Sequence, residues 1–219
     1  MTAALSAERR AVLHRRVRLI VGLTITYNVV EAVVAIWAGA LASSAALIGF
    51  GLDSVIEVLS ALAVAWQFTR ADPERWERIT VRAIGIAFFA LAAYVVTDSV
   101  LSLAGAQDVG SSPVGIGIAT LSVLVMPALA WVEIRTGREL GSRSVLADAR
   151  QLLLCVYLSG TVLIGLLLNT LLGWDWADSV AALVVAALAV REGIEAWGGE
   201  VESPFEVLEE LGEDSEQAV

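Results

Sequence analysis

Two acidic residues in a strongly apolar stretch are the side chains of this sequence most suited to chemistry. Asp53 and Glu57 lie four residues apart within the run 43–68, so a helix there would place both carboxylates on one face, one turn apart. Two carboxylates held so close in a medium of low dielectric repel each other unless a cation or a shared proton lies between them. Competition between a divalent metal ion and protons for this pair would constitute a transport cycle.

A second apolar run, 144–172, offers side chains that complement the acidic pair. Asp148, Gln151 and Cys155 share one helical face, and Gln151 and Cys155 reach the same depth as the pair to within about a turn. Carboxylate, amide and thiol ligands could bind a metal tetrahedrally, with the thiol favouring a softer ion such as zinc. Two alternatives stay open: Cys155 as a small buried packing residue, and Asp148 as the partner of a nearby arginine.

Asn28 and Glu31 stand in a third run, 19–41, three residues apart and on one face. An ionisable side chain in a membrane-spanning helix costs from ~2.5 to over 10 kcal/mol, so each one is a functional candidate. Glu31 is therefore an additional candidate for the metal site or for the entry path of an ion or proton. Asn28, whose polar amide lies on the same face, is a candidate with it. Hydrogen bonding to a neighbouring helix is the alternative.

The elements that must position these residues are membrane helices. Hydrophobic residues make up 58% of the chain and charged residues only 17%, against ~45–50% apolar in a soluble domain. Six stretches approach or exceed the ~20 residues that a spanning helix needs; they are 19–41, 43–68, 82–104, 114–134, 144–172 and 177–197. We predict an all-α, polytopic membrane protein with six transmembrane helices over residues 17–198.

The arginines orient this bundle, because all 14 basic residues are arginine and they alternate by loop. They precede the first run, separate runs two and three, separate runs four and five, and end run six. The positive-inside rule places these loops and both termini in the cytoplasm. The seven tryptophans fall at predicted helix ends or in short loops, as in an aromatic belt.

The two ends of the chain differ in charge. Residues 1–16 form a basic cytoplasmic segment, and residues 199–219 form an acidic cytoplasmic tail, which is either solvated or folded into a short helix after Ser203. With His14 as the only histidine and no Walker-type loop, we expect neither an enzyme nor a resident cofactor.

Some residues near the predicted site have a structural interpretation beside a functional one. Gly49 and Gly51 would permit close approach of a neighbouring backbone at the site, or ordinary helix packing. Asp175 and Asp178 open the last run, where a carboxylate meets the positive end of a helix dipole. Capping of that helix is the interpretation we favour over a metal exit site.

Three segments resemble the cation diffusion facilitator family: residues 39–57, 147–155 and 176–178. In that family a Gly, a Ser and an Ala-Leu precede an acid, three residues and a second acid on helix two, as they precede Asp53 and Glu57 here. The helix-five pattern of the family is Ala-Asp, two residues, His, three residues, Asp. Here Gln151 and Cys155 stand at the His and Asp positions. The resemblance covers residues 17–197.

The resemblance implies a fold and an activity. Members of the family export divalent metals in exchange for protons, as homodimers that hold the metal between helices two and five. Asp53, Glu57, Gln151 and Cys155 occupy the four ligand positions. We therefore expect a metal/proton antiporter in the bacterial inner membrane, with zinc as the leading ion and iron or manganese behind it. Lipid, metal ions and protons are the expected partners, and nucleic acid is not.

Two departures from the family pattern keep alternatives open. Gln151 and Cys155 remove one imidazole and one carboxylate, and these 219 residues contain no counterpart of the family's cytoplasmic C-terminal domain. We therefore expect a short form whose dimer forms through the membrane helices or the tail. The alternatives are a non-transporting membrane scaffold or metal sensor with a transporter-like bundle, and an exporter of organic cations that uses the same acids.

Overall fold

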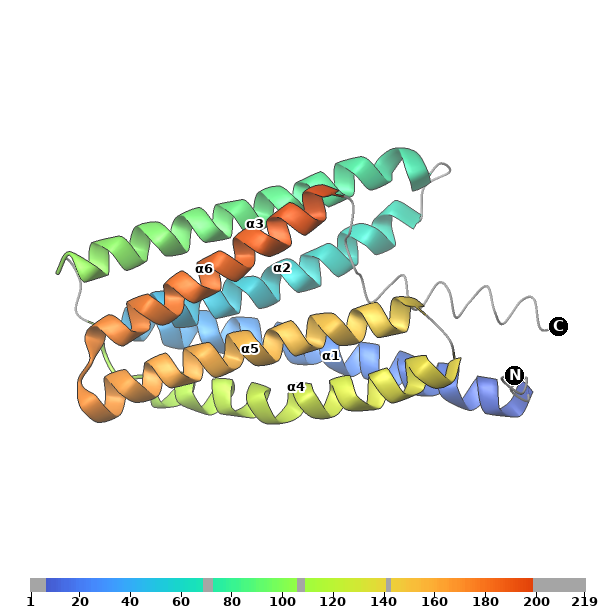
Figure 1. The fold of residues 1–219 in the computed structure, drawn as a ribbon, viewed down its shortest axis with the longest axis horizontal. Helices are drawn as coiled ribbons and strands as arrows, with labels where there is room; N and C mark the ends of the chain where they lie inside the picture. The colour runs from blue at the N-terminus through green and yellow to red at the C-terminus, as the bar shows by residue number, and fades with distance from the viewer. Residues whose placement is uncertain (1–6, 69–72, 106–108, 141–142, 199–219) are drawn as a thin grey trace.

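The computed structural model describes residues 7–68, 73–105, 109–140 and 143–198, apart from some side chains near the helix ends. It is a bundle of helices joined by short connections (Figure 1). The helices run in the order α1 (Ala7–Ala42), α2 (Ala45–Phe68), α3 (Pro73–Leu103), α4 (Pro113–Leu140), α5 (Arg143–Leu172) and α6 (Asp175–Gly198). The acidic tail expected over 199–219 lies outside the described residues.

Each helix contains or closely matches one predicted apolar run, which confirms the all-helical prediction. The structure extends α1, α3 and α4 beyond these runs on the arginine-rich side, so α1 already begins at Ala7. Arginine is a good helix former, and its long apolar stem can stay beside the helix while its charge reaches water. A prediction from hydropathy alone therefore makes these three helices too short at their arginine-rich ends.

Within the described residues, four stretches are long and apolar enough to cross a membrane. They are Ala11–Ala42, Arg82–Leu103, Pro113–Leu140 and Gln151–Leu172. Helices α2 and α6 have 24 residues each, a length of about 36 Å. The number of six crossings and the cytoplasmic placement of the termini stay predictions.

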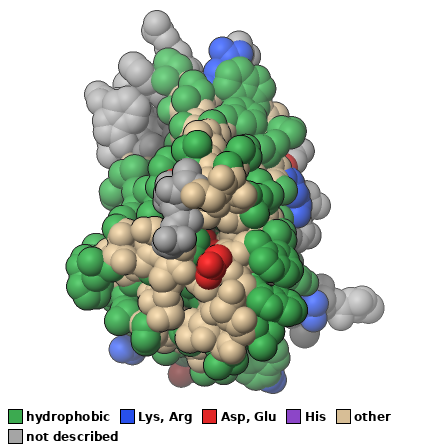
Figure 2. Space-filling view, turned by 90° about the vertical axis from the view of Figure 1, so that its left-hand side faces the viewer, with side chains coloured by type: hydrophobic (Ala, Val, Ile, Leu, Met, Phe, Trp, Pro, Cys, Tyr) green, Lys and Arg blue, Asp and Glu red, His purple; other side chains and the backbone are tan. Residues whose placement is uncertain are grey.

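The helices pack as neighbouring pairs: α1 lies along α2, α3 along α6, and α4 along α5. Helix α2 also contacts α3, α5 and α6, so it occupies the middle of the bundle (Figure 1). Viewed from the end where α1 meets α2 and α5 meets α6, hydrophobic side chains form most of the outline (Figure 2). An outer surface of this kind suits contact with lipid chains.

Glycines set the distances between α2 and its neighbours. A Cβ on Gly51 would lie 2.8 Å from Ile36 Cγ1 and 2.9 Å from the Ile36 backbone nitrogen. Helices α1 and α2 can therefore approach this closely only because residue 51 has no side chain. A Cβ on Gly49 would lie 2.9 Å from Val95 Cγ2 of α3. Both glycines thus serve helix packing, and Gly51 brings the α1 side chains within reach of α2.

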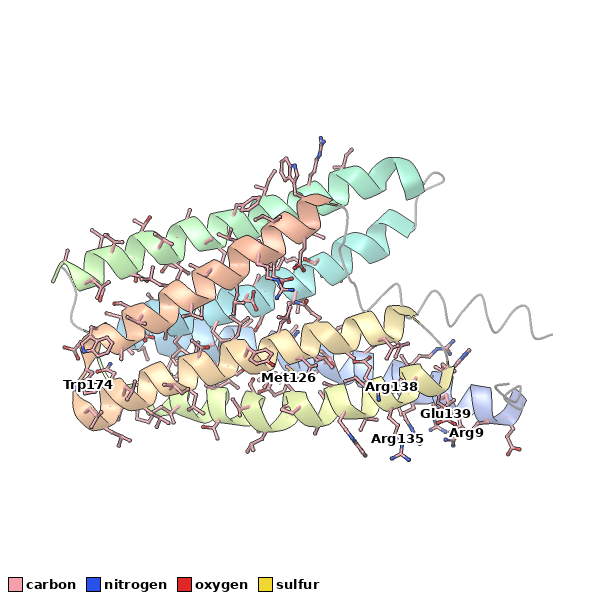
Figure 3. The ribbon with its side chains drawn as sticks, in the orientation of Figure 1. Arg9, Met126, Arg135, Arg138, Glu139 and Trp174 are labelled. Atoms are coloured by element: carbon pink, nitrogen blue, oxygen red, sulfur yellow. The ribbon has the colours of Figure 1, made fainter. Side chains whose placement is uncertain are left out.

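The two ends of the bundle differ in their side chains. At one end, Arg9 donates to both carboxylate oxygens of Glu139, at 2.6 and 2.9 Å, and so fastens the start of α1 to the end of α4. Arg135 and Arg138 lie at the same end, whereas Trp174 lies at the other (Figure 3). There Trp174 stacks on Trp176 with a centroid separation of 5.3 Å.

Asp178 caps a different helix from the one that we predicted. Its carboxylate is fully buried and accepts hydrogen bonds from Ser44 Oγ at 2.5 Å and from the Ala46 backbone nitrogen at 3.4 Å. Because α6 already begins at Asp175, Asp178 is nearly one turn inside its own helix and faces the start of α2. It therefore fixes the first turn of α2 against α6.

Candidate metal-binding site

Glu57 is the centre of a polar cluster in the interior of the bundle. Its Oε2 accepts a hydrogen bond from Asn28 Nδ2 of α1 at 2.6 Å, and its Oε1 accepts from Gln151 Nε2 at 3.1 Å and from Cys155 Sγ at 2.9 Å, both of α5. We call Asn28, Glu57, Gln151 and Cys155 the Glu57 cluster. Helices α1, α2 and α5 therefore meet at one carboxylate.

The cluster contains atoms of the types that ligate metal ions. Cys155 is 4% exposed and Asn28 is 5% exposed, whereas Glu57 and Gln151 are partly buried. Asn28 Oδ1 is buried and has no hydrogen-bond partner among the described residues. A bare carbonyl oxygen beside a carboxylate and a thiol is a set of metal-ligand atoms, and a bound cation would satisfy that oxygen.

Asp53 lies within electrostatic reach of Glu57 and Cys155 but is not hydrogen-bonded to the cluster. Asp53 is buried one turn away on α2, and in the described part of the chain it makes no hydrogen bond to the cluster. The same residues contain no group of three or more His, Cys, Asp or Glu side chains that could hold a metal ion as they stand. A closed four-ligand site with Asp53, Glu57, Gln151 and Cys155 therefore stays a prediction. The Asp148 side chain lies outside the described set.

Glu31 belongs to a second polar group. It is 1% exposed, and its carboxylate accepts hydrogen bonds from Ser54 Oγ at 2.8 Å and from Ser122 Oγ of α4. The Tyr27 hydroxyl lies 2.7 Å from Ser122 Oγ. We call Tyr27, Glu31, Ser54 and Ser122 the Glu31 network. Both Glu31 oxygens are bound to hydroxyl groups, so this structure does not place Glu31 among the ligands at Glu57.

The sequence reasoning missed the hydroxyl members of this network. Ser54 could have been predicted from helix geometry. In an antiparallel helix pair, a step of three residues forward on α1 matches a step of three residues back on α2. A contact between Asn28 and Glu57 therefore implies one between Glu31 and Ser54. Ser122 carries no such signal, because its position depends on how α4 packs against α1.

Two buried hydroxyl groups continue the polar path toward the arginine-rich end. Thr24 stands one turn before Asn28 on α1, and Ser60 stands about one turn after Glu57 on α2. Neither hydroxyl has a hydrogen-bond partner among the described residues. Buried polar groups of this kind are usually satisfied by water, so the arrangement suits the approach of a hydrated ion to Glu57.

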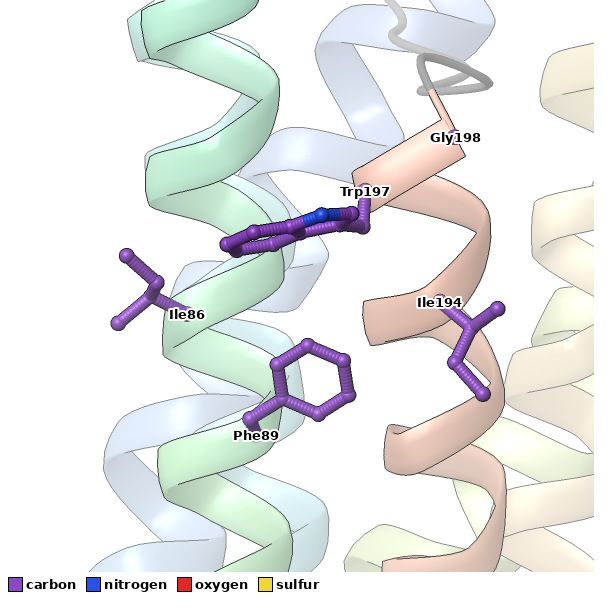
Figure 4. Close-up of a pocket in the computed structure, with 5 residues that line it drawn as sticks. All are labelled: Ile86, Phe89, Ile194, Trp197 and Gly198. Atoms are coloured by element: carbon purple, nitrogen blue, oxygen red, sulfur yellow. The ribbon is translucent and has the colours of Figure 1, made fainter.

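A hollow on the outer face of α3 and α6 has a different character. It is lined by Ile86, Phe89, Ile194, Trp197 and Gly198 (Figure 4). The Arg82 guanidinium lies 5.6 Å from the Trp197 ring centroid. These apolar side chains offer no ligand atoms for a metal ion.

The family comparison matches most of the helical part of the chain. The model of a family described as the cation efflux transmembrane domain matches residues 21–196. This range includes every member of the Glu57 cluster and of the Glu31 network.

Curated relatives agree with this match. An uncharacterised transporter of Synechocystis is 27% identical over 67% of this chain and 50% of its own length. An uncharacterised transporter of Methanocaldococcus jannaschii is 25% identical over 77% of this chain and 63% of its own. A cadmium, cobalt and zinc/H⁺–K⁺ antiporter of Bacillus subtilis is 22% identical over 82% and 60%. The chain thus spans between half and two-thirds of the length of these relatives.

Proposed function

Because the chain belongs to the cation efflux family, we propose that it exports divalent metal cations from the cytoplasm, with zinc as the preferred ion and protons as the counter-ion. The membrane is the bacterial inner membrane, and the working unit is a homodimer. The observation that supports this proposal best is the Glu57 cluster, in which a partly buried carboxylate, a thiol and two amides from three helices converge.

The chemistry of the cluster favours zinc. A thiol suits soft and borderline ions, whereas manganese and magnesium prefer oxygen ligands alone. The Bacillus subtilis relative is named for cadmium, cobalt and zinc, which are ions of this softer group. Iron and manganese are the next candidates, because carboxylate and amide oxygens also bind them.

The hydrogen bonds around Glu57 indicate how a metal would enter. Without metal, three donors stabilise the Glu57 carboxylate. An incoming cation takes over this role, so the Cys155 thiol releases its proton to become a ligand and the amides turn their oxygens toward the ion. A turn of α2 that brings Asp53 to the cation would complete the set of four.

The test is metal flux in proteoliposomes with an imposed pH gradient. We expect zinc transport by the wild type to accelerate with the gradient and to be lost in Glu57→Gln, because the amide cannot supply the negative charge. Ser99→Ala is the matched control, since the Ser99 hydroxyl is buried in α3 and donates only to the Val95 carbonyl oxygen of its own helix, at 2.7 Å. A folded wild type that moves none of zinc, cadmium, cobalt, iron or manganese would refute export.

A metal sensor or scaffold is the second candidate. The observation that favours it is that Asp53 makes no hydrogen bond to the Glu57 cluster, so the described residues hold no complete metal site as they stand. A sensor would bind zinc in detergent without any flux, and a scaffold would tolerate Glu57→Gln and Asp53→Asn without a functional change. The same proteoliposomes, with a binding measurement added, separate the three cases.

A further inference from the structure

The Glu31 network is a second buried site whose chemistry differs from that of the Glu57 cluster. Its members come from α1, α2 and α4, and all their polar atoms are oxygens. The soft and amide ligands of the Glu57 cluster come from α5 and α1. The transport chemistry proposed above uses the Glu57 cluster and leaves the buried Glu31 carboxylate without a role.

The network satisfies Glu31 in its ionised form. An ionised carboxylate is acceptor-only, and here each of its oxygens has one hydroxyl donor, Ser54 or Ser122. The Tyr27 hydroxyl can in turn donate to Ser122 Oγ. All three hydroxyl hydrogens then have an acceptor, which offsets part of the cost of burying the charge.

The same network also satisfies Glu31 in its neutral form. A protonated carboxyl group must donate its own hydrogen, and Ser54 Oγ can accept it if the Ser54 hydroxyl turns elsewhere. The Phe50 carbonyl oxygen, 3.3 Å from Ser54 Oγ, is available as that second acceptor. Rotation of one hydroxyl group therefore completes the hydrogen bonds of either form, without any movement of a helix.

We propose that Glu31 carries a proton of the exchange in addition to the Cys155 thiol proton, and that Glu31 is separate from the side chains that bind the metal; this inference rests on the proposed export function. A proton from the outer solution bonds to a Glu31 carboxylate oxygen. The same O–H bond breaks when metal binds from the cytoplasm, and the proton leaves to that side. The only other covalent bond that changes is the Cys155 S–H bond, which breaks as the sulfur ligates the metal and re-forms when the metal leaves.

Electrostatics couples the two sites. Among the side chains that the structure describes, the titratable groups within electrostatic reach of Glu31 are Tyr27 on α1, Asp53 and Glu57 on α2, and Cys155 on α5; α4 presents the Ser122 hydroxyl. A divalent cation at Glu57 favours ionised Glu31 and so expels its proton. Reciprocally, protonated Glu31 leaves the region less negative and weakens metal binding. Exchange then requires no shared ligand.

The experiment separates metal movement from proton movement in proteoliposomes that hold a pH dye and a zinc dye. In Glu31→Gln, whose amide resembles the protonated acid, we expect zinc–zinc exchange at equal pH to continue. Net zinc flux should respond less steeply to the pH gradient than in the wild type, and each zinc ion that enters should drive the release of fewer protons. Glu31→Asp should keep the coupling, because it keeps a carboxyl group.

Ser54→Ala tests the same mechanism without touching the carboxylate. It removes the rotating hydroxyl, so we expect slower proton-coupled flux with zinc–zinc exchange retained, and it serves as the second variant if Glu31→Gln does not fold. Ser99→Ala again provides the matched serine control. The inference is wrong if both Glu31→Gln and Ser54→Ala stay coupled as the wild type is, or if Glu31→Gln abolishes exchange together with coupling. A wild type that moves no metal would refute the export function instead.

Discussion

At the scale of single residues, Cys155 carries the one soft atom of the Glu57 cluster, so under the proposed function it should decide which ion binds. We expect Cys155→Ser to weaken zinc and cadmium binding by about tenfold or more while manganese binding changes little, because a hydroxyl oxygen is a hard ligand. Competition titrations of the purified protein measure this. Equal loss for zinc and manganese would show that Cys155 contributes packing and not ligation.

The positions of Asp53 and Glu57 show where residue-level prediction ends. Four residues along a helix correspond to a rotation of about 400° and a rise of about 6 Å, so the two carboxylates share a face but do not point in the same direction. Glu57 contacts α1 and α5, whereas Asp53 is within electrostatic reach of Glu192 on α6. The spacing predicts a shared face correctly, and only the packing of three further helices decides which partners each acid has.

At the scale of helices, the contact between α1 and α2 positions the site. A Cβ at Gly51 would overlap Ile36, including its backbone nitrogen, so Gly51→Ala must push α1 away from α2. We expect a loss of ~1–3 kcal/mol in the free energy of unfolding and weaker zinc binding, since Asn28 would move off Glu57. Thermal unfolding in detergent and zinc titration measure the two effects.

Gly160→Ala is the matched control for that change, because a Cβ there would meet nothing within 4 Å. Alanine is the better helix former, by up to about 1 kcal/mol, so this variant should unfold at the same temperature as the wild type or a higher one. Equal behaviour of the two alanine variants would contradict the packing role of Gly51.

The helices themselves were predictable because apolar runs of membrane length leave the backbone no other way to satisfy its hydrogen bonds. The ends of the helices were harder to predict, since the arginine-rich segments are helical without being apolar. The partner of Asp178 was mispredicted for a related reason. A carboxylate near a helix start suggests a local cap, but the open backbone groups that it meets belong to the next helix in space, at Ala46.

At the scale of the whole molecule, the two ends of the bundle have opposite characters. The Arg9–Glu139 ion pair lies at one end and the stacked pair of Trp174 and Trp176 at the other. Helices α1, α3 and α5 run away from the arginine-rich end, and α2, α4 and α6 return to it (Figure 1). Thr24 and Ser60 lie between this end and Glu57, so in the proposed function the direction of transport depends on which compartment this end faces.

Cysteine labelling in intact cells tests this orientation, because the chain has a single cysteine and it is buried. In a Cys155→Ser background, we expect Trp174→Cys to react with a membrane-impermeant maleimide from the periplasmic side. Arg138→Cys, at the exposed end of α4, should react only after the inner membrane is permeabilised, since arginine-rich loops stay in the cytoplasm. Both variants should react fully in detergent, which controls for accessibility. The reverse pattern would place the arginine-rich end on the outer side. A protein that takes up metal at that end would then be an importer.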